Sequence, residues 1–168
     1  MKIVVSMSND NDVEEVENLL EKENWILEED DVLYLVLLNF VKMKMYQKVI
    51  NIAEELKVFN KDCFLSLYGY CIDQLNFDSK KKTFLEKLDD LVEENISKVH
   101  LMYLNYLKIK FNDERSYELF EYLRYEAIPY FSTHQHILYN ECFNKKYVEL
   151  LMKLSRYKEA VIHLLNYQ

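Results

Sequence analysis

The side chains closest to a metal site or a nucleophile lie in the last third of the chain. His134 and His136 are two residues apart, and Cys142 follows six residues later. On a helix the two imidazoles would point about 200° apart, so they could share a metal ion only on an extended segment. Cys142 and His163 have the residue types of a nucleophilic pair, but no neighbouring group would orient them. We therefore expect no metal site, no cofactor and no catalytic residue.

A second candidate for chemistry is the run of acids and amides at residues 9–12, which resembles the start of a calcium-binding loop. Such a loop also needs a glycine at its sixth position and a bidentate glutamate at its twelfth. Here Glu14 and Asn18 occupy that region instead. Asp12 therefore fits better as a helix cap, and residues 28–31 fit as the acidic first turn of the next helix.

Glycine and proline are almost absent: Gly69 and Pro129 are the only ones among 168 residues. Phosphate-binding loops, dinucleotide fingerprints and nucleophile elbows each need two or more glycines. Hairpin-rich β folds need glycine, asparagine–glycine or proline at their tight turns. The composition thus excludes most familiar enzyme scaffolds and predicts a helical, non-enzymatic protein.

The net charge of −8 is placed unevenly. Residues 1–31 hold eleven acids against two lysines, whereas residues 32–168 hold 18 acids against 19 bases. We expect one domain over 1–168, with an acidic N-terminal segment at 1–31 and a near-neutral helical-repeat body at 32–168. No basic face is available for phosphates, so we expect no direct nucleic-acid binding.

The longest apolar stretch covers only residues 32–41, too short to span a bilayer as a helix. No signal peptide is evident, and the three cysteines have no C-x-x-C spacing. We therefore expect a cytoplasmic protein with reduced thiols and no membrane anchor.

Apolar residues recur at intervals of three and four over most of the chain, which predicts an all-α fold. Pro129 is expected to end one helix, because the residue before a proline is driven out of the helical region. Two of the expected helices are apolar on more than one face, which favours a stack of antiparallel helix pairs over a four-helix bundle. The eight or nine helices are expected near 11–22, 30–43, 46–58, 61–76, 79–94, 97–111, 114–127, 133–153 and 156–167.

Residues 33–56 and 147–165 resemble tetratricopeptide repeats. In that family an aromatic residue opens the second helix and a small residue follows three positions later. Tyr157 and Ala160 match this pattern, and Tyr46 matches it with the bulkier Val49. The family's turn glycine falls on Lys44 in the first stretch and on Ser155 in the second. The resemblance implies a superhelix of helix pairs that holds a peptide or a partner helix on its concave face.

Two asparagines in apolar segments are the most informative polar residues of the sequence. Asn39 and Asn105 each lie in the middle of an otherwise apolar helix, and a buried amide left unpaired costs on the order of 1–3 kcal/mol. Each amide either makes an internal hydrogen bond that fixes helix register or faces a groove and bonds a peptide backbone. Tyrosines on the same kind of helix would add contact area with a polar tip. The candidate partner-binding residues are Tyr34, Asn39, Tyr70, Tyr103, Asn105 and Tyr106.

We expect a non-enzymatic helical-repeat adaptor or regulatory protein that binds a protein or peptide segment. A first alternative is a small acidic inhibitor or immunity-type protein, which would use residues 10–31 to block a basic surface of an enzyme or nucleic-acid-binding protein. The repeats also resemble the peptide-sensing domains of Gram-positive quorum-sensing regulators, which implies a second alternative. That alternative is a peptide-sensing regulator without a DNA-binding module.

The composition predicts a helical content of more than ~65% for the full chain, about twice the average for globular proteins. Each tetratricopeptide-like repeat consists of two helices and a turn, so almost no strand is expected. Far-ultraviolet circular dichroism measures both quantities. A strand content above about one fifth would contradict the helical-repeat architecture.

Overall fold

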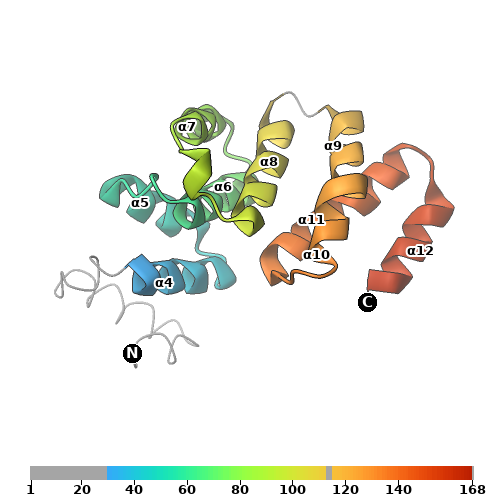
Figure 1. Ribbon diagram of the computed structural model, residues 1–168, viewed down its shortest axis with the longest axis horizontal. Helices are drawn as coiled ribbons and strands as arrows, with labels where there is room; N and C mark the ends of the chain where they lie inside the picture. Colours follow the sequence, from blue (N-terminus) through green and yellow to red (C-terminus); the bar gives the residue numbers. More distant parts are fainter. Residues whose placement is uncertain (1–29, 113–114, 168) are drawn as a thin grey trace. The chain divides into compact units, whose positions relative to one another are not determined.

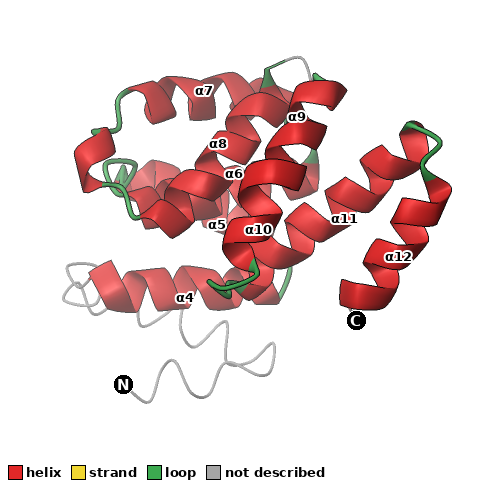
Figure 2. Ribbon diagram, turned by 45° about the vertical axis from the view of Figure 1, so that its right-hand side comes forward, coloured by secondary structure: helices red, strands yellow, loops and turns green. Residues whose placement is uncertain are grey.

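The computed structural model describes residues 30–112 and 115–167, and this part contains helices but no strand (Figures 1 and 2). The all-α prediction is therefore confirmed, while the helix expected at 11–22 lies outside the described residues. A 3₁₀ turn spans Glu93–Asn95, and a π-helical segment, η2, spans Leu123–Ala127. The α-helices are α4 (Asp30–Lys42), α5 (Tyr46–Leu56), α6 (Asp62–Leu75), α7 (Asp78–Asp89), α8 (Lys98–Phe111), α9 (Ser116–Tyr122), α10 (Ile128–Phe131), α11 (Ile137–Lys153) and α12 (Tyr157–Tyr167).

The chain divides into two compact units, with the boundary along the sequence between residues 93 and 94. The first unit contains α4 to α7, and the second contains α8 to α12 with η2. Each unit has its own buried residues and is described by itself below. The expectation of one domain over 1–168 stays a prediction.

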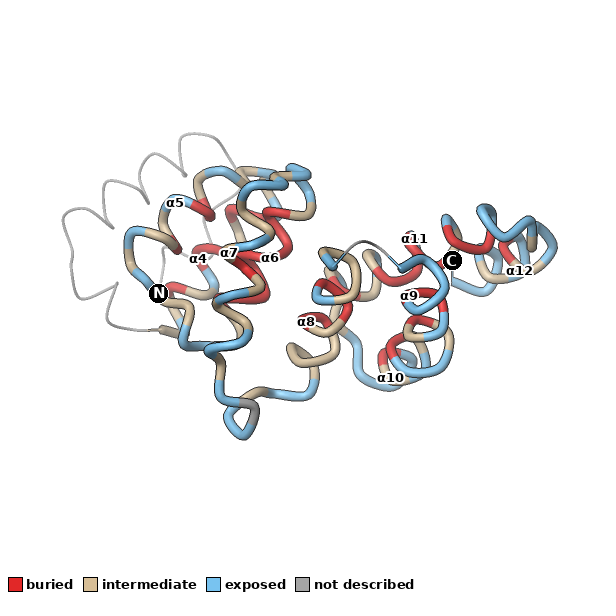
Figure 3. Tube along the Cα trace, turned by 90° about the horizontal axis from the view of Figure 1, so that it is seen from above, coloured by how far each residue is buried: buried red, intermediate tan, exposed pale blue. Residues whose placement is uncertain are grey.

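Helix α6 is the centre of the first unit. It packs against α4, α5 and α7, and every residue from Phe64 to Ile72 is buried (Figure 3). Gly69 lies inside this buried run, while α4 contributes Val36 and Phe40, neither of which is exposed. A helix covered along its whole middle in this way has to be apolar on several faces.

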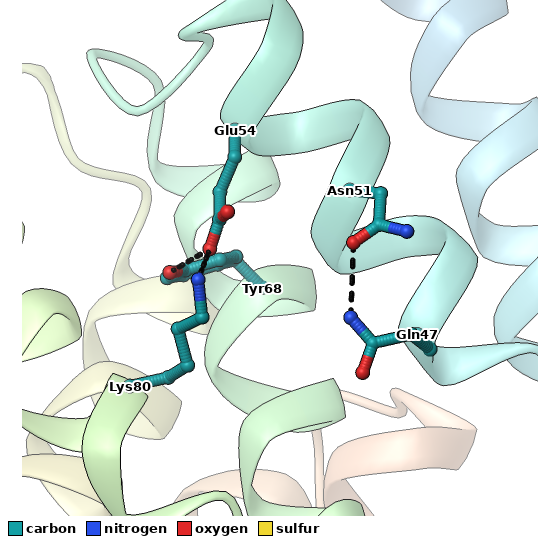
Figure 4. A network of polar contacts seen from close by, with 5 residues as sticks. All are labelled: Gln47, Asn51, Glu54, Tyr68 and Lys80. Carbon is teal, nitrogen blue, oxygen red and sulfur yellow. Dashed lines mark hydrogen bonds and ion pairs between the residues drawn. The ribbon is translucent and has the colours of Figure 1, made fainter.

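A polar network ties three helices of this unit together (Figure 4). The Tyr68 hydroxyl donates to Glu54 Oε1 at 3.0 Å, and Lys80 Nζ lies 2.5 Å from the same oxygen. Burial raises the pKa of Tyr68, and the neighbouring Glu54 carboxylate raises it further. The Tyr68 hydroxyl therefore stays protonated and acts as a donor, so that α5, α6 and α7 share one partly buried polar contact.

Helix α11 has the corresponding role in the second unit, where it packs against α9, η2, α10 and α12. Aromatic rings fill the interior of this unit. Tyr103 of α8 stacks on Tyr139 of α11 with ring centroids 4.1 Å apart, and Tyr106 meets Phe143 edge-on at 5.1 Å. All four rings are at most 1% exposed. Parallel and edge-to-face ring pairs add to the free energy gained by burial alone.

The expectation that Pro129 ends a helix is wrong. Ile128 keeps helical angles (φ −63°, ψ −45°), and the helical path runs through the proline to Phe131. The preceding segment, η2, widens into a π-turn in which the Ile128 N–H bonds Leu123 O, five residues back. A widened turn relieves the clash between a proline ring and the carbonyl of the fourth residue before it. The break that was expected at Pro129 falls later, in the loop before Ile137.

Several helices end on a left-handed residue that is not glycine. Lys44, Asn76 and Ser155 have φ values of 59°, 48° and 58°. After each of them a pair of backbone bonds closes the helix end: at Ser155, its N–H bonds Met152 O at 3.0 Å and the next N–H bonds Leu151 O at 2.9 Å. This is the Schellman pattern, which normally carries glycine because other residues meet a Cβ clash at positive φ.

Ser155→Gly is expected to stabilise the protein by about 0.5–1 kcal/mol, because it removes this clash and keeps both capping bonds. The gain is partly offset by the larger backbone freedom of glycine in the unfolded chain. Urea denaturation measures the free energy of unfolding. Lys153→Gly, in the last turn of the same helix, is the control and should destabilise by about 1 kcal/mol. An equal loss for both variants would contradict the strain at Ser155.

Candidate functional site

Three of the sequence-predicted site residues lie in the first unit. Tyr34 and Asn39 belong to α4 and Tyr70 belongs to α6. The Asn39 amide donates to Leu35 O of its own helix at 2.8 Å. Tyr70 is only 8% exposed and meets Tyr46 edge-on at 6.1 Å. Burial, followed by the nearby Cys63 and Asp62, raises the pKa of Tyr34 to about 12.

The other three lie on α8 in the second unit. Tyr103 and Tyr106 are 0% and 1% exposed, so their rings belong to the aromatic interior and offer no contact area at the surface. Burial and the nearby Glu126 raise the pKa of the Tyr122 hydroxyl, and the side-chain amide of Asn105 opposes this rise. The hydroxyl itself donates to Met102 O at 2.7 Å. Asn105 thus has an internal partner across α8 and α9. The partner-binding role of all six residues stays a prediction.

The histidines that stood out in the sequence have aromatic partners. The His134 ring stacks on Tyr130 at 4.2 Å, and the His136 ring stacks on Tyr139 at 3.7 Å. His136 caps α11, where its Nδ1 accepts from the Tyr139 N–H at 3.5 Å. Across residues 30–112 and 115–167, no three His, Cys, Asp or Glu side chains converge to hold a metal ion.

Cys63 and Cys71 are not activated in the way that a nucleophile requires. Burial raises the pKa of Cys63 to about 11, and burial also raises that of Cys71. A thiol with a raised pKa is protonated at neutral pH and is a poor nucleophile. His163, the residue considered beside Cys142 as a nucleophilic pair, places Nε2 2.6 Å from Asn144 Oδ1 and its ring against Tyr147.

The most distinctive surface feature is an arginine cluster in the second unit, made of Phe120, Arg124, Tyr147, Arg156 and Glu159. The Cζ atoms of Arg124 and Arg156 lie 5.7 Å and 5.4 Å from the Phe120 ring centroid. Phe120 in turn stacks on Tyr147 at 5.6 Å, with an angle of 9° between the ring planes. Four elements therefore meet here: α9, η2, α11 and the start of α12.

One carboxylate serves both guanidinium groups of the arginine cluster. Glu159 Oε1 accepts from Arg156 Nε at 3.1 Å and lies 3.0 Å from Arg156 Nη2, while Arg124 Nη1 is 3.6 Å from Glu159 Oε2. The cluster keeps one surplus positive charge. Burial raises the pKa of the Tyr147 hydroxyl, whereas the two arginines oppose this rise. The three charged side chains remain 34–43% exposed.

Buried aromatic rings support the two guanidinium groups of the arginine cluster. Phe120 and Tyr147 are 3% and 8% exposed, so their rings form a fixed floor under the guanidinium groups. The Tyr147 ring meets His163 at 4.8 Å, and Asn144 donates to Asn140 O at 2.7 Å while contacting His163. A guanidinium oriented on aromatic faces loses less side-chain entropy when it binds an anion than a mobile one does.

Sequence reasoning missed this cluster, although a weak signal exists. Only three of the 21 basic residues are arginines, and two of them precede a tyrosine: Arg124 with Tyr125, and Arg156 with Tyr157. Tyr125 and Tyr157 are 67% and 55% exposed. Tyrosine and arginine are both enriched among the residues that contribute most of the binding energy at protein interfaces. Their convergence in space, however, depends on how α9, α11 and α12 pack.

The first unit has a shallow cleft of about 540 Å³ between the end of α5 and α7. Its floor is Phe59, with Lys87 Nζ 5.6 Å from the ring centroid. Lys57 lines the cleft as well, but so do the carboxylates of Glu54 and Asp90. Charges of both signs around an open cleft select no single ligand, so the arginine cluster is the better candidate site.

The depressed pKa of His136 predicts a pH-dependent stability. Burial, followed by the neighbouring His100, lowers the pKa of His136 from 6.5 to about 4. The unfolded chain therefore binds the extra proton first as the pH falls through this range, and stability should drop between about pH 6.5 and 4. The expected loss is ~1–2 kcal/mol, after a discount for solvent around the half-buried ring.

Chemical denaturation at a series of pH values measures this loss. His136→Asn keeps a side-chain acceptor at the helix start but does not titrate, so its stability should change less over the same interval. The same pH slope in wild type and His136→Asn would assign the effect to other groups, of which His163, with its pKa lowered by burial, is one.

Comparison with known proteins assigns this chain to no family. No family model matches the chain, and no match was found among curated proteins or solved structures. The tetratricopeptide resemblance therefore stays a prediction. Its two marked positions do begin helices, since α5 starts at Tyr46 and α12 starts at Tyr157. None of the described helices has the length and apolar composition needed to cross a membrane.

Proposed function

We propose that this protein is a non-enzymatic helical adaptor that binds a segment of another protein through the arginine cluster. The observation that carries the proposal is the pair of guanidinium groups, Arg124 and Arg156, held over Phe120 and shared by one carboxylate. Such groups are oriented before a partner arrives, which lowers the entropic cost of binding.

The backbone under the cluster supports the same proposal. Arg124 and Tyr125 lie on η2, the π-helical segment Leu123–Ala127. Single π-turns within α-helices occur frequently at functional sites, because the extra residue changes the direction in which the following side chains project. Tyr125 is 67% exposed, and the Arg124 Cζ lies 5.7 Å from its ring centroid. A large aromatic side chain beside an oriented arginine is suited to protein contacts.

Helix α12 adds an apolar surface beside the cluster. Ala160 is its only buried residue among those described, and the rest of the helix is largely accessible (Figure 3). Four of its exposed apolar residues follow i, i+4, i+7 and i+8 spacing, the pattern of a helix face that packs against another helix. Contiguous apolar surface of this kind indicates an interaction site. The face consists of Tyr157, Val161, Leu164 and Leu165, which are 45–68% exposed.

Affinity capture with quantitative mass spectrometry tests the proposal on the full chain. The baits are the wild type, the double variant Arg124→Gln with Arg156→Gln, and the control Arg115→Gln. Arg115 is the third arginine, and its side chain is 77% exposed. At least one protein should bind the wild type and the control equally and bind the double variant ten- to hundredfold less, as expected when two central contacts are lost.

Thermal melts of all three baits separate loss of binding from loss of folding. The double variant should melt within a few degrees of wild type, because half-exposed ion pairs contribute little to stability. Recovery of the same proteins in the same amounts by all three folded baits would contradict the proposed function.

A further inference from the structure

We propose, on the basis of the function above, that the group recognised by the arginine cluster is a carboxylate of an acidic partner segment. The partner's carboxylate binds the N–H donor edge of the Arg124 guanidinium group. Arg156 is the second cation, and Glu159 is the internal carboxylate that the partner's side chain either joins or displaces.

Arg124 has unused donors. A guanidinium carries five N–H donors in one plane. Among the described residues, Arg124 makes one ion pair, 3.6 Å from Glu159, and two ring contacts at 5.7 Å, with Phe120 and Tyr125. Within residues 30–112 and 115–167 the Arg124 guanidinium donates no side-chain hydrogen bond, and its side chain is 34% exposed. The planar group is thus fixed by stacking while its donor edge remains available, which is the geometry that binds a carboxylate through two parallel bonds.

Arg156, in contrast, is already committed to Glu159. Its Nε and Nη2 atoms lie 3.1 Å and 3.0 Å from the same oxygen, Oε1. The other oxygen, Oε2, faces Arg124 at the longer distance. A second carboxylate that entered beside Arg124 would therefore meet a guanidinium group whose internal partner, Glu159, is bound more tightly to Arg156. The asymmetry of these distances assigns the incoming anion to Arg124.

The charge of the surroundings favours a monoanion. The two arginines and Glu159 leave one positive charge, and the same stretch of helix carries Glu121 and Glu126, both exposed. A carboxylate matches a single surplus charge, whereas a phosphate near −2 would be repelled by the flanking glutamates. Exposed Tyr125 beside the site fits an acidic segment that also contains apolar side chains.

Side-chain NMR on the ¹⁵N-labelled full chain tests the inference directly. With three arginines in the chain, the Nε–Hε region contains three signals, each assignable by one arginine-to-lysine substitution. The probes are a capped octapeptide with one glutamate and two leucines, the same peptide with glutamine in place of the glutamate, and a phosphotyrosine peptide on the glutamine background.

The glutamate peptide should shift the Arg124 signal in a saturable manner, and the shift should be at least fivefold smaller for the Arg115 signal. The glutamine peptide should produce no saturable shift. The carboxylate inference is wrong if Arg124 does not respond, if Arg115 responds equally, or if the phosphotyrosine peptide binds more tightly than the glutamate peptide.

Glu159→Gln provides a second, independent measurement. Removal of the internal carboxylate frees both guanidinium groups, so the glutamate peptide should bind about two- to tenfold more tightly. Weaker binding would show that Glu159 orients the arginines and does not compete with the ligand. That result would contradict the displacement of Glu159 by the partner's carboxylate. If Arg124 ignores the peptides while the double arginine variant still loses its protein partner, the adaptor function stands and the carboxylate assignment fails.

Discussion

Pro129 imposes the backbone constraint on which the candidate site depends. Proline has no N–H to donate, and its ring collides with the carbonyl four residues earlier in a regular α-helix. This chain keeps the helical path by widening one turn, so that the Ile128 N–H reaches Leu123 O. Arg124 and Tyr125 lie inside that widened turn. The position of Arg124 over Phe120 is thus linked to the one residue that cannot donate to the backbone hydrogen-bond ladder.

Aromatic stacking determines which tyrosines are surface and which are core. Tyr103 and Tyr139 stack at 4.1 Å, and His136 continues the stack on Tyr139 at 3.7 Å. Close parallel rings exclude water from the ring faces, which explains why Tyr103 and Tyr139 are buried despite their polar tips. The second pair, Phe120 and Tyr147, ends under two guanidinium groups and not under another ring. One kind of contact therefore builds the interior of the second unit and also supports its candidate site.

Helix ends in this chain are built without glycine. Lys44, Asn76 and Ser155 occupy left-handed positions, and backbone bonds of the Schellman type compensate for their strain. Lys44 and Ser155 stand two residues before Tyr46 and Tyr157, which begin α5 and α12. The recurrence of a tight turn followed by an aromatic helix start gives both units the same local connection. It places Arg156 in the turn, where it reaches Phe120 and Glu159.

The sequence by itself determined the all-α class, the approximate helix bounds within the described residues and the lack of glycine-dependent sites, because these follow from local periodicity and composition. It did not determine the fate of Pro129, since a π-turn needs the surrounding helices to hold it. Nor did it separate buried Tyr103 and Tyr106 from exposed Tyr125, because all of them lie on helices with similar patterns. Only the tertiary structure decided that Arg124 and Arg156, 32 positions apart, share one carboxylate. Packing of η2 and α12 against α11 creates that contact, and no spacing along the chain encodes it.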